Sequence, residues 1–295
     1  MYLMNKSSFI IGVLTIIYYL LFLLLYLQDV INEFVFVCIL FLSLIILLIY
    51  LIVFRKQSVN KRKIAIATFI IFLLFLYEFP LALIYNPPTY LANIYKQPSE
   101  VLEGSGIFLV GFSQLNLTEK SKRDVIEILS KQQADVLSVE EVDNKMIYSS
   151  KNSQILKLLH LQKDPIKQMG ENVTQYLGKE EELVNSFTKQ SDTSGSSAGL
   201  GLALSGRLKN GDYQNRLPIA VTGAINENGE VLSIGYMIEK IQIVEKSGIP
   251  YMIIPSENAE QAAAIQKELK AKVEIFDVSH VDEAVQLIQH LNDIH

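Results

Sequence analysis

The chain has 295 residues, half of which are hydrophobic, and carries one cysteine, no tryptophan and a formal net charge of −5. Residues 1–86 have a net charge of +3, and residues 87–295 have a net charge of −8. The acidic remainder argues against a nucleic-acid-binding protein, because phosphate binding needs a concentrated positive patch. With Cys38 as the single cysteine, an internal disulfide and a cysteine-based zinc site are both excluded.

Three long apolar runs occupy the first 86 residues, at about 9–27, 34–54 and 64–85. The first two contain no charged residue, and the third contains only Glu78. Each run is long enough to cross a hydrocarbon core of about 30 Å as a helix that rises about 1.5 Å per residue. A signal peptide has a shorter apolar region and no second or third span. The sequence therefore predicts a membrane domain of three transmembrane helices that contacts the lipid bilayer.

The charges between these runs predict the orientation. Residues 55–63 carry five positive charges, whereas residues 28–33 carry Asp29 and Glu33 and no positive charge. Under the positive-inside rule, residues 55–63 and the N-terminus with Lys6 lie in the cytoplasm. The third run then leads outward. We therefore expect a multi-pass protein of the cell membrane whose remaining chain is extracytoplasmic.

Glu78 stands near the outer end of the third run, and no second charge lies within the apolar runs to pair with it. We expect its side chain near the membrane interface, within reach of water, rather than in a polar relay. For the same reason the three runs do not suggest a transporter, since one carboxylate offers no obvious path.

Residues 87–103, which begin with two prolines, are expected to connect the membrane domain to a mixed α/β domain at 104–295. Strands are expected at 107–112, 136–142, 217–225, 230–234, 251–254 and 273–276, and helices at 118–131, 153–161, 166–188, 198–204, 237–247, 257–271 and 281–291. Thr118 is a plausible N-cap of the first of these helices, and Asn228-Gly229 is a typical hairpin turn.

A loop of small and polar residues at 189–197 leads into the helix at 198–204. A helix N-terminus presents unpaired N–H groups and the positive end of the helix dipole. Ser197 at this junction would therefore sit beside donors for an oxyanion, and Gly195 lets the backbone turn toward them. From this segment alone, an ordinary serine-rich helix cap explains the pattern better than an oxyanion site does.

The residues that follow favour the oxyanion site over the ordinary helix cap. Ser197-Ala198-Gly199, Thr222-Gly223, Gly229–Gly235 and Glu239-Lys240 occur in this order, and 43 residues separate the first serine from the lysine. Together with the later stretch at 248–258, these motifs resemble the proteolytic domain of the Lon family of serine peptidases, specifically over about residues 190–290. The resemblance implies a Lon proteolytic-domain fold of the α/β (α+β) type, preceded here by the three transmembrane helices.

The resemblance also implies the roles of individual residues. Ser197 corresponds to the nucleophile and Lys240 to the general base of a Ser–Lys dyad, with Thr222 orienting the lysine. Backbone N–H groups around Ser194 and Ser197 correspond to the oxyanion hole. A serine hydroxyl needs a neighbouring base, and a lysine serves as one only if burial lowers its pKa. The apolar residues around Lys240 in the sequence meet this demand.

Two positions depart from the family pattern. Ser196 stands where the family usually has proline, and Ser194 stands where it commonly has an acidic residue. These departures motivate an alternative function, a catalytically silent membrane scaffold or sensor that keeps the fold to bind polypeptides.

No histidine, ATP or metal chemistry is indicated. The four histidines lie in surface-like helices or at the terminus, so a histidine triad is not supported. No Gly-x-x-x-x-Gly-Lys-Ser/Thr motif occurs. We therefore expect a membrane-anchored, ATP-independent serine endopeptidase without a cofactor or bound metal, which acts on unfolded or membrane-proximal polypeptides. A homo-oligomer is implied only by the family, whose peptidase domains commonly form rings.

Overall fold

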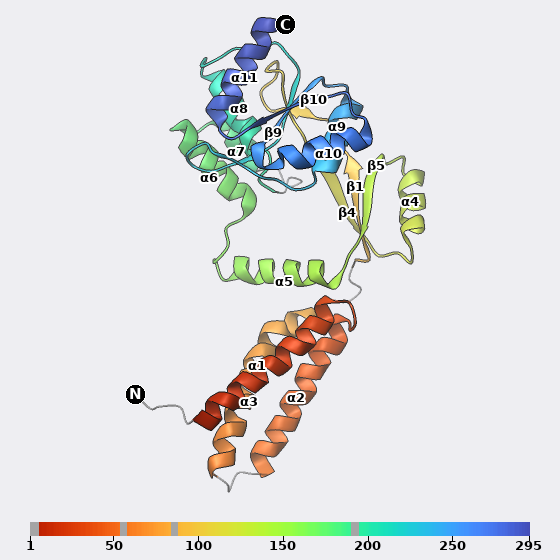
Figure 1. Cartoon of the computed structure of the whole chain (residues 1–295), viewed down its shortest axis with the longest axis vertical. Helices are drawn as coiled ribbons and strands as arrows, with labels where there is room; N and C mark the ends of the chain where they lie inside the picture. The colour runs from red at the N-terminus through yellow and green to blue at the C-terminus, as the bar shows by residue number, and fades with distance from the viewer. Residues whose placement is uncertain (1–5, 54–57, 84–87, 190–194) are drawn as a thin grey trace. The chain divides into compact units, whose positions relative to one another are not determined.

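The computed structural model describes residues 6–53, 58–83, 88–189 and 195–295 (Figure 1). The chain divides into two compact units. The first comprises Met1–Tyr90, Thr118–Lys120 and Glu141–Leu159, and the second comprises Leu91–Leu117, Ser121–Glu140 and His160–His295. Residues 141–159, which we expected in the soluble domain, thus group with the apolar helices. The expected connector at 87–103 contains two strands, so part of it belongs to the sheets.

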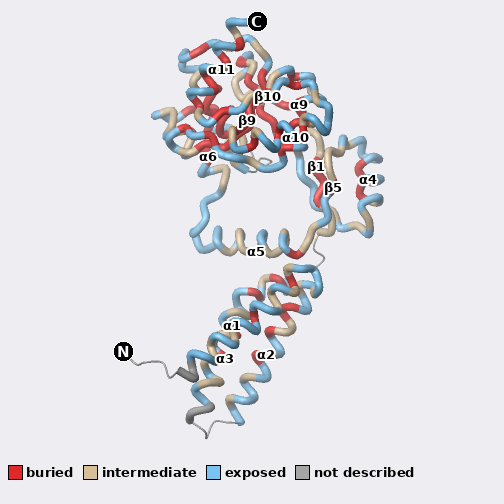
Figure 2. The backbone as a smooth tube through the Cα atoms, in the orientation of Figure 1, coloured by how far each residue is buried: buried red, intermediate tan, exposed pale blue. Residues whose placement is uncertain are grey.

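The first unit contains three long helices that are apolar enough to cross a membrane by length and composition. They are α1 (Lys6–Leu27), α2 (Glu33–Val53) and α3 (Ser58–Glu78). Figure 2 shows that much of their outer surface is exposed, and the exposed side chains there are mainly large and apolar. A bundle that is apolar on its outside is typical of helices solvated by lipid. Pro80 ends the α-helical pairing, and the chain continues as the short 3₁₀-helix η1 (Phe79–Leu83).

Helix α5 (Asn144–Leu158) crosses one end of this bundle within the same unit (Figure 1). It begins nine residues before the helix predicted at 153–161, because Asp143 caps it by accepting a hydrogen bond from the Met146 N–H. The Asn144 amide donates to the carbonyls of Tyr26 and Ile31. These bonds fix the start of α5 to the segment between α1 and α2.

The prediction that Glu78 reaches water is wrong. Its side chain is fully buried, and its carboxylate forms an ion pair of 2.5 Å with Lys151 of α5. The hydroxyls of Tyr19 and Tyr148 donate to the same carboxylate at 2.7 Å and 3.1 Å. The missing partner comes from a helix outside the apolar runs, so counting charges within those runs did not reveal it.

The second unit is built on a five-stranded sheet in the order β10-β9-β6-β3-β2. Its first four strands are parallel, and β2 pairs with β3 in the antiparallel direction. The strands are β2 (Ser99–Glu100), β3 (Ile107–Leu109), β6 (Ile219–Val221), β9 (Tyr251–Pro255) and β10 (Glu274–Val278). Strands β6 and β9 are apolar along almost their whole length because helices cover both of their faces.

Alternate residues of these strands pack into two separate cores. Ile219, Val221 and Ile253 pack with α8 (Gly199–Lys209), α11 (Val281–Ile294) and α6 (Pro165–Leu177). Ala220 and Met252 pack with α9 (Met237–Ser247) and α10 (Ala259–Leu269) on the other face. Figure 2 shows many buried residues around β9, β10 and α9 of the second unit. The sheet therefore separates α8, which follows Ser197, from α9, which carries Lys240.

A three-stranded sheet with the order β4-β1-β5 lies upstream of these elements in the sequence. Its strands are β1 (Tyr90–Tyr95), β4 (Phe112–Leu117) and β5 (Val136–Glu141), of which only β5 was predicted. The helix predicted at 118–131 begins later, as α4 (Lys122–Lys131), because its N-cap is Ser121 and not Thr118. The hydroxyl of Ser121 accepts a hydrogen bond from the Asp124 N–H at 3.2 Å.

Glycines and short breaks account for the other differences. The single helix predicted at 166–188 is two helices, α6 and α7 (Glu182–Thr188), because Gly178 ends α6 in the left-handed conformation with φ of 69°. The strand predicted at 217–225 divides into β6 and β7 (Ala224–Ile225) at Thr222-Gly223. Strand β7 then pairs with β8 (Val231–Leu232), which confirms the predicted hairpin.

Candidate active site

Ser197 lies two residues before the first residue of α8, next to the break between β6 and β7. The Gly223 N–H donates to the Ser197 carbonyl at 2.8 Å, and the Leu200 N–H donates to the Gly223 carbonyl at 2.9 Å. This reciprocal pair holds the start of α8 against the β6–β7 break. A side chain at Gly201 would meet Leu109 of β3 at 2.1 Å, so glycine allows α8 to approach the sheet closely.

Lys240 lies in the first turns of α9, and its side chain is only 3% exposed. Its amine donates to the Ser197 hydroxyl at 3.0 Å, to the Thr222 hydroxyl at 2.8 Å and to the Val110 carbonyl at 3.3 Å. Three acceptors match the three hydrogens of an ammonium group. The structure thus brings together Ser197, Lys240 and Thr222 and adds Val110, which the sequence did not indicate.

The burial of Lys240 has an electrostatic consequence. Desolvation lowers its pKa to about 8, and the neighbouring Glu239 carboxylate opposes this by raising it. A lysine with this pKa is partly neutral near neutral pH, so its nitrogen has a lone pair that can accept a proton. This is the property that the sequence argument required of the lysine.

Asn258 holds the chain at the entry to α9. Its side-chain oxygen accepts from the Ile234 N–H at 3.0 Å, and its amide donates to the Ile234 carbonyl at 3.1 Å. Tyr236, which precedes α9, is in the left-handed conformation with φ of 59°. Asn258 belongs to the stretch at 248–258 that the resemblance included, but its contact with Ile234 depends on the tertiary structure.

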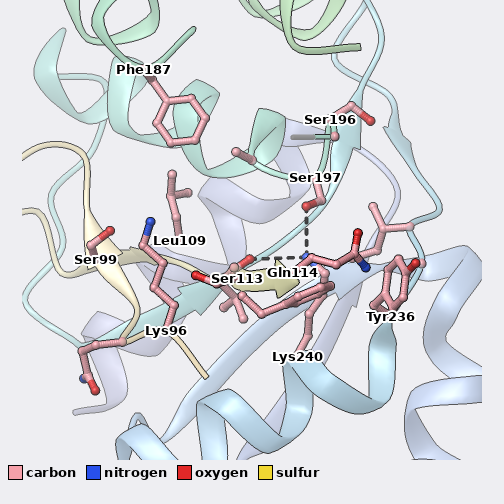
Figure 3. Close-up of a pocket in the computed structure, with 18 of the residues that line it drawn as sticks. Lys96, Ser99, Leu109, Ser113, Gln114, Phe187, Ser196, Ser197, Tyr236 and Lys240 are labelled. Atoms are coloured by element: carbon pink, nitrogen blue, oxygen red, sulfur yellow. Dashed lines mark hydrogen bonds between the residues drawn. The ribbon is translucent and has the colours of Figure 1, made fainter. Parts of the chain in front are cut away.

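Ser197 and Lys240 open onto a cleft of about 750 Å³ (Figure 3). Figure 3 shows Phe187 and Leu109 to one side of the serine and Tyr236 to the other, with the lysine below the hydroxyl. The cleft is lined by Lys96, Gln97, Ser99, Leu109, Val110, Gly111, Phe112, Ser113, Gln114, Phe187, Gly195, Ser196, Ser197, Ala198, Ser233, Ile234, Gly235, Tyr236 and Lys240. No carboxylate or histidine occurs in this lining, as far as the described residues define it. Apolar and aromatic side chains of this cleft thus lie on both sides of the serine.

The expected oxyanion donors are only partly described. Ser194 lies outside the described residues, so its predicted role stays a prediction. Gly195 is described and has a φ of 87°, a conformation that favours glycine. Ser197 lies at the N-terminal end of α8, where the helix dipole favours negative charge.

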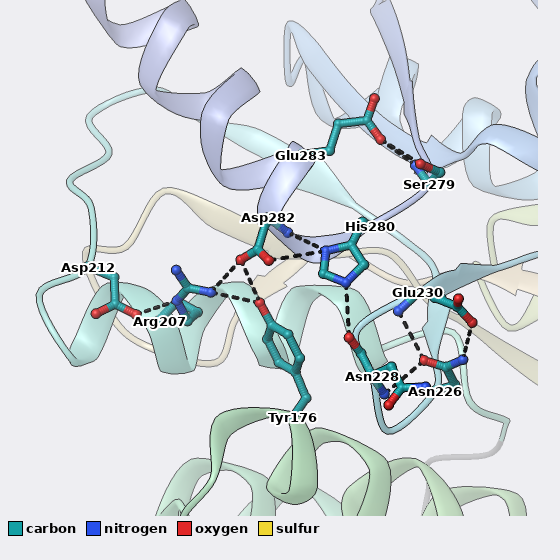
Figure 4. A network of polar contacts seen from close by, with 10 residues as sticks. All are labelled: Tyr176, Arg207, Asp212, Asn226, Asn228, Glu230, Ser279, His280, Asp282 and Glu283. Atoms are coloured by element: carbon teal, nitrogen blue, oxygen red, sulfur yellow. Dashed lines mark hydrogen bonds and ion pairs between the residues drawn. The ribbon is translucent and has the colours of Figure 1, made fainter.

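His280 caps a helix away from the cleft lining (Figure 4). Its Nδ1 accepts from the Asp282 N–H at the start of α11, and its Nε2 lies 2.9 Å from the Asn228 carbonyl oxygen. Asp282 pairs with Arg207 of α8 at 2.7 Å and accepts from the Tyr176 hydroxyl at 3.0 Å. This network connects α6, α8 and α11. Among the described residues, no group of three or more His, Cys, Asp or Glu could hold a metal ion.

Residues 171–290 match the family of the Lon protease (S16) C-terminal proteolytic domain. This part of the chain is a Lon-type proteolytic domain. The match confirms the resemblance to the Lon family and the mixed α/β fold that the motifs around Ser197 and Lys240 predicted for these residues. The match begins within α6 and ends within α11, whereas the apolar helices, α5, the β4-β1-β5 sheet and strands β2 and β3 lie before it.

Several curated Lon proteases are similar to this segment. The protein from Lawsonia intracellularis is 36% identical over 85 residues, which are 29% of this chain and 10% of that protein. The protein from Syntrophomonas wolfei is 35% identical over 92 residues, or 31% and 11% of the two chains. Lon protease 1 from Thermus thermophilus is 37% identical over 73 residues, or 25% and 9%. The chain thus spans about a tenth of the length of these relatives.

Proposed function

We propose that this chain is a membrane-anchored serine endopeptidase in which Ser197 and Lys240 hydrolyse peptide bonds. The observation that carries the proposal is the 3.0 Å contact between the Lys240 amine and the Ser197 hydroxyl, at the bottom of a cleft in a Lon-type proteolytic domain. Nucleophile and base within hydrogen-bond reach are the geometric requirement for activating a serine.

The proposed reaction moves one proton back and forth. Neutral Lys240 accepts the proton of the Ser197 hydroxyl as its oxygen attacks the scissile carbonyl carbon. The resulting ammonium gives that proton to the leaving amine, and an acyl group remains on Ser197. A water molecule then attacks the acyl carbon while Lys240 accepts its proton. The proton returns to the Ser197 oxygen as the carboxylic acid leaves. With a lysine pKa of about 8, roughly a tenth of the amine is neutral at pH 7.

Thr222 has a supporting role in this proposal. Its hydroxyl accepts from the Lys240 amine at 2.8 Å and donates to the Ser197 carbonyl at 3.4 Å. These two contacts hold the lysine nitrogen in line with the serine oxygen. Backbone N–H groups around Ser194 and Ser197, near the positive end of the α8 dipole, would stabilise the oxyanion.

The location and the energy source belong to the same proposal. The three apolar helices support anchoring in a membrane, and the positive charges at 55–63 support a cytoplasmic N-terminus with the cleft outside the cytoplasm. The sequence has no phosphate-binding Gly-x-x-x-x-Gly-Lys-Ser/Thr motif, which supports activity without ATP. Such an enzyme would act on polypeptides that are already unfolded, flexible or close to the membrane.

The experiment uses the full chain in detergent micelles without nucleotide. Hydrolysis of an unfolded protein and labelling by a fluorophosphonate serine probe are compared for wild type, Ser197→Ala and Lys240→Met. Both variants should lose hydrolysis and labelling, whereas the matched control Lys267→Met, at an exposed lysine of α10, should retain them. Equal cleavage by wild type and both variants contradicts the proposal. Binding of the unfolded protein without hydrolysis or labelling supports the alternative, a silent scaffold.

A further inference from the structure

Glu239 is a buried carboxylate that the proposed reaction does not use. It directly precedes Lys240 in α9, and its side chain is only 5% exposed. A buried charge is costly unless hydrogen bonds compensate for the loss of water. The Ser138 hydroxyl donates to the Glu239 carboxylate at 2.6 Å, and the Asn93 amide donates to the same oxygen at 3.1 Å. The burial of this carboxylate is thus supported by two specific donors.

Both donors come from the sheet that precedes the Lon-type match in the sequence. Asn93 lies in β1 and Ser138 in β5, and the Asn93 amide also contacts the Ser138 hydroxyl at 2.9 Å. The side-chain oxygen of Asn93 accepts from Gln114 of β4 at 3.0 Å. Gln114 lines the substrate cleft. One hydrogen-bonded chain thus runs from the cleft wall through all three strands to the helix that carries the lysine.

We propose that Glu239 is a positioning residue for Lys240. Hydrogen bonds from β1 and β5 hold its carboxylate in place on the helix that carries Lys240, and this fixed negative charge governs how readily the amine takes the proton of Ser197. This proposal rests on the function proposed above. It assigns the upstream sheet a role in setting the base, although this sheet lies outside the segment matched by the family.

The charges around the lysine make this effect specific. Glu239 acts from its own helix, and Lys96 lines the same cleft. The segments that contact the amine present the neutral groups of Ser197, Thr222 and Val110. Glu239 raises the pKa of Lys240 against the larger lowering by burial. Removing its charge therefore lowers this pKa further and makes the amine neutral at lower pH.

The test measures Lys240 directly in the full chain in micelles. Competitive acetylation by acetic anhydride over a pH series, read by mass spectrometry of the peptide that contains Lys240, reports the fraction of neutral amine. The wild-type midpoint is expected near pH 8, and Glu239→Gln, which keeps the shape and an acceptor oxygen, should move it down by about one unit. The control Glu268→Gln removes an exposed carboxylate of α10 and should leave the midpoint unchanged.

A second variant tests the link to the sheet. Ser138→Ala removes the 2.6 Å bond that helps to hold the Glu239 carboxylate in place, and we expect it to lower the Lys240 midpoint by a smaller amount. In the Glu239→Gln background the same change should have no further effect. The proposal is overturned if Glu239→Gln keeps the wild-type midpoint, or if Ser138→Ala acts equally in both backgrounds. Acetylation of Lys240 needs no catalytic turnover, so the two proposals can fail separately. Absence of Ser197-dependent cleavage contradicts the proposed function. The Lys240 midpoints decide the role of Glu239 in either case.

Discussion

The Lys151 amine lies 2.5 Å from the Glu78 carboxylate, and both side chains are almost completely withdrawn from solvent. The rings of Tyr77 and Tyr148 lie 4.1 Å and 4.2 Å from the same amine. The pair joins α5 to the end of α3 over 73 residues of sequence. Charge pairing and two aromatic faces together hold this contact in an apolar surrounding.

Breaking this pair should release α5 from the bundle. Glu78→Gln or Lys151→Met leaves the opposite charge buried without its partner, and we expect each to cost about 3–5 kcal/mol. The double variant should cost less than the sum of the two, because no unpaired charge remains. Thermal unfolding in micelles and limited proteolysis within 141–159 measure the effect. Removing the exposed pair of Lys131 and Glu127 is the control and should change neither readout. Additive costs in the double variant would contradict a direct pairing.

The rate of acylation should depend on pH through Lys240. The lysine acts as a base only when neutral, and burial lowers its pKa to about 8. We therefore expect kcat/KM to rise about tenfold per pH unit below pH 8 and to level off above it. The rate of serine-probe labelling over pH 6–9.5 gives the same profile without a peptide substrate. A rate that is constant over this range would exclude Lys240 as the base.

Thr222→Val should slow the reaction more than it destabilises the fold. The change keeps the shape of the side chain but removes the hydroxyl that accepts from Lys240 at 2.8 Å. Loss of one hydrogen bond to a charged group corresponds to about 1.5–3 kcal/mol, so we expect kcat/KM to fall by about ten- to a hundredfold. Thr174→Val, on α6 and away from the cleft lining, is the control. A Thr222→Val enzyme with the wild-type rate would show that the hydroxyl does not orient the lysine.

The predicted membrane orientation can be read by cysteine labelling in intact cells. In a Cys38→Ala background, a cysteine at Lys267 should react with an impermeant maleimide from outside. A cysteine at Gln57, in the basic segment 55–63, should react only after the cells are permeabilised. The opposite pattern would invert the topology and place the cleft in the cytoplasm.

Local signals predicted some elements well. Helix α9 has the bounds 237–247 that its periodicity and the stop at Gly248 indicated. Strands β1 and β4 were missed because neither shows a strong apolar run, and their partners lie elsewhere in the sequence. The short break at 178–181 was hidden within a longer helical pattern, because the left-handed Gly178 is its main mark.

Some residues of the candidate active site could likewise be predicted from the sequence, and others could not. Ser197, Lys240 and Thr222 were predicted because their motifs keep a fixed order and separation over 43 residues. Val110 and the two donors to Glu239 were not predicted, since each lies more than 100 residues upstream of the residue that it contacts. The burial that lowers the pKa of Lys240 was expected from its apolar neighbours in the sequence. The hydrogen-bond partners of the Lys240 amine, however, depend on how the sheet packs with α8 and α9.

Strand β3 limits how the protein can be divided. It lies between β6 and β2 in the main sheet and precedes the Lon-type match, which begins at residue 171. A fragment of residues 171–290 would leave the backbone of β6 unpaired along one side and would remove Leu109 from its contact with α8. An open edge of this kind invites pairing between chains. A fragment made for crystallisation must therefore begin ahead of β2, so that it keeps the two strands that close this side of the sheet.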